Sequence, residues 1–207
     1  MPLLTREDIR RHVPLTWVSL LALAGTALAL WVIGRQGAAL GTAAALLGCL
    51  GLVLPPRERM AVLPWRLRAL PRGLDAAPVL ATLLSTPGYG LGWFYAAGPY
   101  DEIVHLVNGV LAGLLFAALL RADGVPRGAM RLAGLAMAFG LLLAVGWEIF
   151  EWATGLIGDW TDTWTDVLLT LLGATLGAPL MALRSRSSGG RRAGNLAGGG
   201  MARGSCG

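Results

Sequence analysis

The sequence predicts an all-α protein, a polytopic membrane helix bundle with six transmembrane helices. Of the 207 residues, 55% are hydrophobic and 14% are charged, whereas soluble domains carry about 25% charged residues. The hydrophobic residues are gathered in runs long enough to cross a bilayer as helices, which takes about 20 residues. The lipid bilayer is therefore the surroundings that we expect for most of the chain.

The first two expected spans follow a short basic N-terminal segment, residues 1–14. Residues 15–33 are almost uncharged and continue well past a signal-like Ala27-Leu28-Ala29, which favours an uncleaved anchor over a cleaved secretory signal. Residues 37–54 form the second span. Pro55-Pro56 end it, because proline cannot continue a helix.

Residues 55–75 join the second span to the third and contain five arginines interspersed with Trp65 and Leu67. This mixture is typical of a segment that lies at an anionic cytoplasmic membrane surface. The third span is expected at residues 76–98. Pro87 and the glycines beside it predict a kink or a local unwinding within this span.

Three more spans are expected at residues 103–120, 132–152 and 164–183. They account for the remaining long apolar runs and leave no soluble domain. Residues 184–207 are rich in glycine, serine and arginine, which predicts a disordered basic tail.

The arginines predict the orientation. All 17 basic residues are arginine, and sixteen of them fall in the N-terminal segment, in the connections 55–75 and 121–131, and in the tail. Short loops rich in arginine remain in the cytoplasm. The sequence therefore predicts cytoplasmic N and C termini in the inner membrane of a bacterial cell, and no binding of nucleic acid, because no element carries a basic stripe.

This orientation gathers carboxylates at the outer ends of the last three spans. Seven of the twelve acidic residues fall there: Asp101, Glu102, Glu148, Glu151, Asp159, Asp162 and Asp166. Only Arg35 is expected on the same side of the membrane. Ionisable groups at the edge of a span are costly and usually mark function.

Residue counts predict that three of these helices bring polar groups to one depth. His105 lies 16 residues before Arg121, Glu148 lies 17 residues after Arg131, and Asp166 lies 18 residues before Arg184. At 1.5 Å per residue these separations correspond to roughly 24–27 Å. On a helix, His105 shares a face with Asp101 and Asn108, four residues before it and three after it.

A divalent metal ion would compensate this negative charge. We expect Asp101, His105, Glu148 and Asp166 as its ligands, and imidazole together with carboxylates suits zinc, manganese or iron more than magnesium. Glu151 and Asp162 are the candidate catalytic residues that would move a proton. Two alternatives stay open: the carboxylates share protons without a metal, and Asp162 only caps the sixth span.

The same residues resemble a known family. The pattern consists of Tyr100-Asp101-Glu102-Ile103-Val104-His105, Trp147-Glu148-Ile149-Phe150-Glu151-Trp152, and Gly158-Asp159 followed by Asp162-Thr163, Asp166, Gly173 and Gly177. It resembles the YjdF-like family of bacterial inner-membrane proteins over residues 75–183. More distantly it is similar to the VanZ-like family, in which asparagine and glutamine are usual at the positions of Thr170 and Glu151. The resemblance implies a polytopic protein with a shared site and brings no settled reaction.

Three functions follow as hypotheses. The first is an outward-facing, metal-assisted hydrolase that acts on a lipid-linked or envelope substrate. The second is a transporter that couples to protons or cations, and the third is a non-catalytic partner of an envelope protein. No H-E-x-x-H or G-x-S-x-G motif identifies a known hydrolase.

Overall fold

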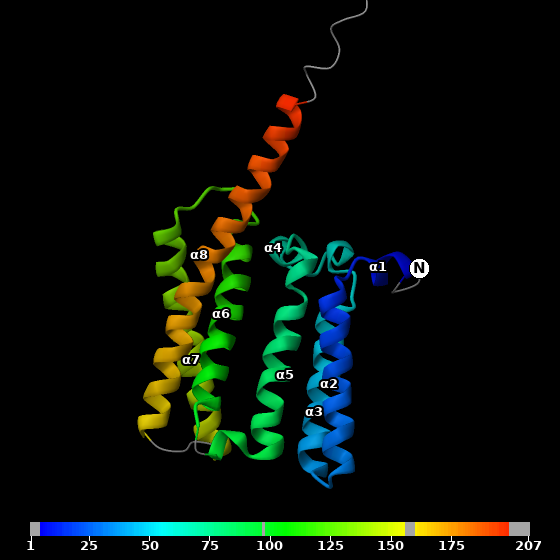
Figure 1. The fold of residues 1–207 in the computed structure, drawn as a ribbon, viewed down its shortest axis with the longest axis vertical. Coiled ribbons are helices and arrows are strands. Elements are labelled where there is room, and N and C mark those ends of the chain that lie inside the picture. The colour runs from blue at the N-terminus through cyan, green and yellow to red at the C-terminus, as the bar shows by residue number, and fades with distance from the viewer. Residues whose placement is uncertain (1–4, 97, 156–159, 199–207) are drawn as a thin grey trace, which may run out of the picture.

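The computed structural model describes residues 5–96, 98–155 and 160–198, in which all regular structure is helical. The long helices are α2 (Pro14–Val32), α3 (Gln36–Val53), α5 (Ala76–Leu91), α6 (Tyr100–Arg121), α7 (Ala129–Thr154) and α8 (Trp160–Gly198). Two short helices, α1 (Arg6–Arg10) and α4 (Trp65–Arg68), lie at one end of the bundle (Figure 1). Three 3₁₀ turns complete the order: η1 (Arg57–Arg59), η2 (Arg72–Leu74) and η3 (Trp93–Tyr95).

Five of the described helices are long and apolar enough to cross a membrane: α2, α3, α6, α7 and the first 22 residues of α8. The third span, predicted at residues 76–98, is not confirmed as one continuous helix. Helix α5 has 16 residues, about 24 Å, which is short of a hydrocarbon core of roughly 30 Å. The chain leaves the helix at Gly92, whose φ of 76° is the left-handed conformation that glycine adopts without strain.

The helix break therefore lies after Leu91 and not around Pro87, where the sequence predicted it. Pro87 stays inside α5. A proline leaves a carbonyl of the preceding turn without its usual donor. Two hydroxyl groups bond to the carbonyls on either side of this one, which belongs to Leu83: Thr86 Oγ1 donates to the carbonyl of Thr82 at 2.7 Å, and the hydroxyl of Tyr100 on α6 donates to the carbonyl of Leu84.

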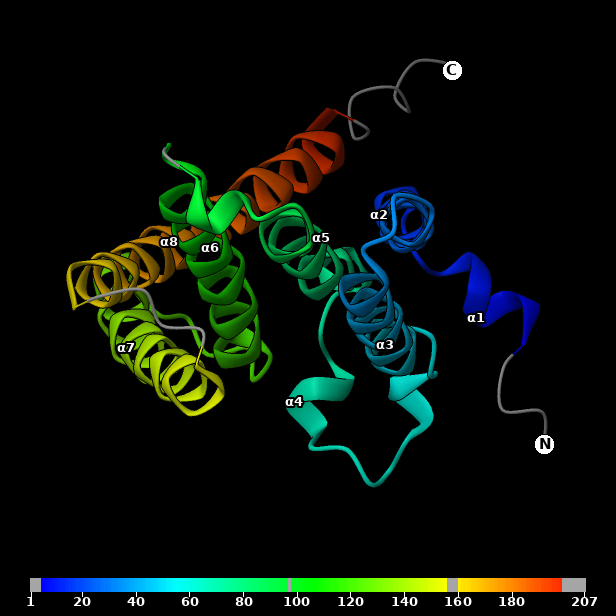
Figure 2. The same cartoon turned by 90° about the horizontal axis from the view of Figure 1, so that it is seen from below.

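The long helices form two groups of three, seen side by side in Figures 1 and 2. In the first group α2, α3 and α5 surround a core of Leu20, Leu23, Cys49, Val53 and Val79. In the second group α6, α7 and α8 surround Ala117, Leu132, Ala136 and Ala178. Helices α5 and α6 join the groups, so the bundle contains a seam between two separate cores.

Glycines bring the backbones of α6 and α8 into direct contact. A Cβ atom at Gly109 or Gly113 of α6 would clash with the carbonyl oxygen of Thr170 or Ala174. Gly173 and Gly177 of α8 are equally close to carbonyl oxygens of α6. Small residues of this kind let membrane helices pack closely, and here they fix the register of α8 against α6.

The segment between α3 and α5 folds back onto the end of the bundle. Its Arg57 is buried and pairs with Asp75, which also accepts a hydrogen bond from Arg72 at 3.3 Å and lies 3.0 Å from His12 Nδ1. The sequence predicted these arginines at the membrane surface. Arg57 and Arg72 tie the segment and the N-terminal residues together, because a buried carboxylate needs paired donors, and the position at the membrane surface stays a prediction.

Asp123, in the connection from α6 to α7, links this segment to the second helix group. Arg66 of α4 donates to Asp123 Oδ2 at 2.9 Å, and Arg127 donates to both carboxylate oxygens at 2.6 and 2.7 Å. The hydrogen bonds from Arg127 hold the pKa of Asp123 well below its usual value, so the carboxylate is ionised at neutral pH.

Helix α8 continues past the predicted end of the sixth span at residue 183 and reaches Gly198. The sequence predicted a disordered tail at residues 184–207, whereas the structure describes residues 184–198 as helical. Between Met181 and Gly198 no proline interrupts the chain, and alanine, leucine and arginine, which favour helix, outnumber the glycines, which disfavour it. Residues 199–207 lie outside the described residues, and disorder there stays a prediction.

A single added methyl group tests the contact between α6 and α8. We expect Gly113→Ala to lower the melting temperature in detergent, because overpacking costs about 1–3 kcal/mol. Gly134→Ala on α7 is the matched control, since nothing lies within 4 Å of a Cβ atom there. The control should be neutral or stabilising, as alanine favours helix. Equal melting temperatures for both variants would contradict the close backbone contact.

Candidate functional site

Asp101, His105 and Asp166 meet at the end of the bundle opposite to α1 and α4. Asp101 and His105 are one turn apart on α6, and Asp166 faces them from α8. His105 Nε2 lies 3.3 Å from Asp101 Oδ1 and 3.6 Å from Asp166 Oδ2. Three of the four predicted metal ligands thus come together as the residue spacing predicted.

The second imidazole nitrogen of His105 contacts Thr170, one turn after Asp166 on α8. His105 Nδ1 lies 3.2 Å from Thr170 Oγ1, and Thr170 is buried. A hydrogen on Nδ1 donated to this hydroxyl leaves the lone pair of Nε2 facing the two carboxylates. Metal-binding histidines are commonly oriented in this way by a partner on the other nitrogen.

The three side chains are largely shielded from solvent. The exposed fraction is 4% for the Asp166 side chain, 12% for His105 and 18% for Asp101. Carboxylates in such a place are costly unless a positive charge is paired with them. Among the described residues, His105 is the ion-pair partner of both Asp101 and Asp166.

The separations of these atoms suit a metal ion. One ligand atom from each residue lies within 4.8 Å of the other two. Ligand atoms about 2.0–2.2 Å from a tetrahedral zinc ion are roughly 3.3–3.6 Å apart, which agrees with both distances from His105 Nε2. The distance of 3.6 Å from His105 Nε2 to Asp166 Oδ2 is longer than an ordinary hydrogen bond. A shared metal ion therefore describes this pair better than a direct hydrogen bond does.

Glu148, the fourth predicted ligand, lies outside this group of three. It is buried on α7 with 8% of its surface exposed. Its Oε2 atom is buried and has no hydrogen-bond partner among the described residues. Burial of such an oxygen is unfavourable and needs an explanation. Its role as a ligand stays a prediction.

The two predicted catalytic residues have different surroundings. Glu151, on the last turn of α7, accepts a hydrogen bond at 3.0 Å from the hydroxyl of Tyr89 on α5. Asp162 is exposed in the first turn of α8, where a carboxylate also stabilises the helix terminus. Asp159 lies outside the described residues. Proton transfer by Glu151 or Asp162 stays a prediction.

Tyr89 and Ser85 were missed by the sequence analysis. Ser85 Oγ accepts a hydrogen bond from Asn108 Nδ2 at 3.3 Å, while Asn108 Oδ1 is buried without a hydrogen-bond partner in the described part of the chain. Both residues flank Pro87, where the sequence predicted a kink or a local unwinding. Their spacing of four residues on α5 is the signal that places them on one face.

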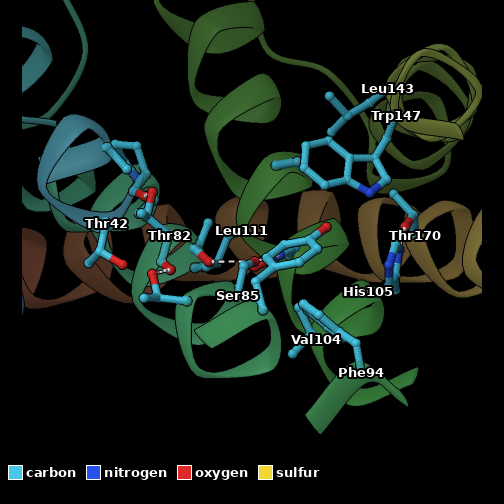
Figure 3. A pocket seen from close by; sticks show the side chains of 18 of the residues that line it. Thr42, Thr82, Ser85, Phe94, Val104, His105, Leu111, Leu143, Trp147 and Thr170 are labelled. Atoms are coloured by element: carbon cyan, nitrogen blue, oxygen red, sulfur yellow. Dashed lines mark hydrogen bonds between the residues drawn. The ribbon is translucent and has the colours of Figure 1, made fainter. Parts of the chain in front are cut away.

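A cavity of about 590 Å³ adjoins the cluster and follows the seam between the two helix groups. Figure 3 shows His105, Thr170 and Trp147 at one side of it and Thr42 and Thr82 at the other. Most of its lining is apolar, and the volume is typical of small-molecule sites. His105 therefore belongs both to the ligand cluster and to the wall of a cavity.

Removal of the charge at Glu148 should not destabilise the metal-free protein. We expect Glu148→Gln to raise the melting temperature or leave it unchanged, because its Oε2 makes no hydrogen bond that the substitution would break. Glu58→Gln is the control: Glu58 accepts hydrogen bonds from Arg72 at 2.8 and 2.5 Å, so this variant should melt at a lower temperature. A large loss of stability in Glu148→Gln alone would show that the carboxylate is structurally paired.

Comparison with known proteins agrees with this picture. Residues 14–187 match the family described as "Predicted membrane protein (DUF2238)". No curated protein and no solved structure gives a significant match. The YjdF-like resemblance is consistent with the family match, and nothing found supports the VanZ-like resemblance. Because the match covers most of the chain and all residues of the cluster, the protein belongs to the DUF2238 family of predicted membrane proteins.

Proposed function

We propose that Asp101, His105 and Asp166 bind a divalent metal ion, zinc, manganese or iron, in an enzyme that hydrolyses a lipid-linked or envelope substrate. The observation that carries this proposal is the approach of three ligand atoms from two helices to within 4.8 Å of one another. Three protein ligands with a position left for water or substrate are typical of catalytic zinc sites. Glu148 is the proposed further ligand, and with it bound, water or substrate would take a fifth position.

The chemistry that a divalent ion supplies at such a site is polarisation of a phosphoryl or carbonyl oxygen and activation of water. Thr170 holds the His105 ring through Nδ1, so that Nε2 stays directed at the carboxylates. Glu151 is the proposed proton carrier, because the Tyr89 hydroxyl keeps its carboxylate oriented. Asp162 is the alternative carrier at the rim.

The proposed location is the outer side of the bacterial inner membrane. The arginine-rich connections lie at the end of the bundle that contains α1 and α4, and the cluster lies at the opposite end (Figure 1). Short arginine-rich loops favour the cytoplasm. This proposal includes cytoplasmic termini and a sixth crossing made by the shorter helix α5.

Transport of protons or cations is the second candidate, and one observation favours it: Glu148 carries a buried carboxylate oxygen that has no hydrogen-bond partner among the described residues. The cavity argues against it. Among its lining residues only His105 and Tyr89 have titratable side chains, and both lie near the same end. A proton path across the bundle would need carriers at other depths.

The metal content of the purified protein tests the proposal. Plasma mass spectrometry of protein prepared without chelators should find close to one zinc, manganese or iron ion per chain. His105→Ala and Asp166→Asn should each lose most of it, because each removes one ligand. Glu102→Gln is the control, since Glu102 is exposed beside the cluster and outside the group of three.

Two results would contradict the metal site: no bound metal in the wild type, or equal metal in the wild type and His105→Ala. The cluster would then be better explained by carboxylates that share protons, and pH-driven uptake into vesicles would be the next measurement. Metal that is lost equally in Glu102→Gln would indicate loose binding to the acidic end of the bundle.

Thr170 should tune the site without being a ligand. We expect Thr170→Val to weaken metal binding about 10–100-fold, the usual effect of losing the partner of a histidine ligand. Valine keeps the shape of the side chain, so packing against α6 is retained. Competition with a metal chelator measures the affinity. Thr170→Ser keeps a hydroxyl group and should bind metal as tightly as the wild type. Unchanged affinity in Thr170→Val would show that the hydrogen bond to Nδ1 does not orient the imidazole.

A further inference from the structure

The cavity beside the cluster is a long groove. Its lining residues on α5 run from Ala77 to Gly90, which corresponds to about 20 Å along a helix. Residues of α3, α6 and α7 complete the walls, and Thr170 of α8 lies at the end near the cluster. The groove therefore extends from His105 toward the interior of the bundle, over a distance greater than half of a hydrocarbon core of roughly 30 Å.

The hydroxyl groups in the groove do not make it polar. Thr42 donates to the carbonyl of Ala38 at 2.8 Å, Thr82 to Pro78 at 2.9 Å and Ser85 to Ala81 at 3.0 Å. Each hydroxyl hydrogen is thus used within its own helix. The remaining wall consists largely of alanine, glycine, leucine and threonine methyl groups, which suits an apolar occupant and not a file of water.

Small residues create the space. Ala81 on α5 and Ala112 on α6 line the groove where the two helices adjoin, and Gly41 lies opposite on α3. The cavity is partly open to the outside of the bundle, not enclosed. Figure 2 shows α3 and α7 on the same side of the α5 and α6 pair, as two walls that flank it. In a membrane, an opening between these helices faces lipid.

The length of the groove and the difference between its two ends decide which occupant fits. About 20 Å of largely apolar wall ends at polar atoms of His105 and Asn108. A molecule with an apolar chain and a polar head matches both parts, and the surrounding bilayer supplies such molecules. An apolar transmembrane helix of a partner would leave the buried Asn108 Oδ1 without a hydrogen-bond donor.

We propose that this groove binds one acyl chain of a membrane phospholipid and so places the first polar group after that chain beside His105 and Thr170. The polar end of the groove supports this direction. The His105 ring and Asn108 Oδ1 both lie there, and Asn108 Oδ1 is buried without a hydrogen-bond partner in the described residues. Any reaction of the bound lipid rests on the proposed function, but binding of the acyl chain needs no metal.

Photochemical cross-linking tests the groove directly. The probe is a phosphatidylethanolamine with a photoreactive diazirine in one acyl chain, incorporated into nanodiscs with the wild-type protein. After irradiation, mass spectrometry of peptides should find label concentrated on groove residues of α3, α5 and α6. Ala112→Phe and Ala81→Phe fill the groove from two different helices, and each should reduce this label at least about tenfold.

Ala22→Phe on the exposed face of α2 is the matched control and should leave labelling unchanged. Elution volume and melting temperature, measured on the same preparations, show that each variant is folded. Label spread evenly over exposed helix faces, or equal groove labelling in the wild type and both filled variants, would overturn the proposal. His105→Ala separates the two proposals: it should lose metal but keep the label, so failure of one leaves the other standing.

Discussion

The contact between the backbones of α6 and α8 is the constraint on which the site depends. Gly109 and Gly113 of α6 lie against carbonyl oxygens of α8, and Gly173 and Gly177 of α8 lie against those of α6. Without side chains between them, the helices are held in one register. That register places Asp166 and Thr170 on either side of His105, so that each ring nitrogen faces a polar partner. Larger residues at these glycines would separate the helices, and the short distances from His105 would be lost.

The sequence was sufficient to locate the cluster, because helical geometry converts residue counts into depth. His105, Glu148 and Asp166 were expected at one level, and the structure brings Asp101, His105 and Asp166 together there. The third span was harder to predict. Hydropathy cannot show that α5 ends before Gly92, since the aromatic residues that follow are uncharged and do not mark the end of the run. Proline was also misread: it removes only one backbone hydrogen bond, and α5 continues through Pro87 to Leu91.

Pairs between distant elements could not be read from the sequence either. Tyr89 and Glu151 are 62 residues apart, and His12 and Asp75 are 63 apart. Periodicity shows which face of a helix is polar but not which helix it meets. The arginines of residues 55–75 illustrate this: their number predicted the side of the membrane, whereas the burial of Arg57 on Asp75 depends on how the connection folds. Charge patterns thus predict topology better than contacts.

The seam between the two helix groups gives the cluster its significance. A single continuous core would have covered His105 with packed side chains, but the cores of α2, α3 and α5 and of α6, α7 and α8 are separate. The groove between them ends at the same histidine that pairs with Asp101 and Asp166. The carboxylates lie on α6 and α8, while the apolar walls come mainly from α3, α5 and α6. A substrate with an apolar chain and a polar head would therefore contact both helix groups, and His105 is the residue where the two parts of such a molecule would meet.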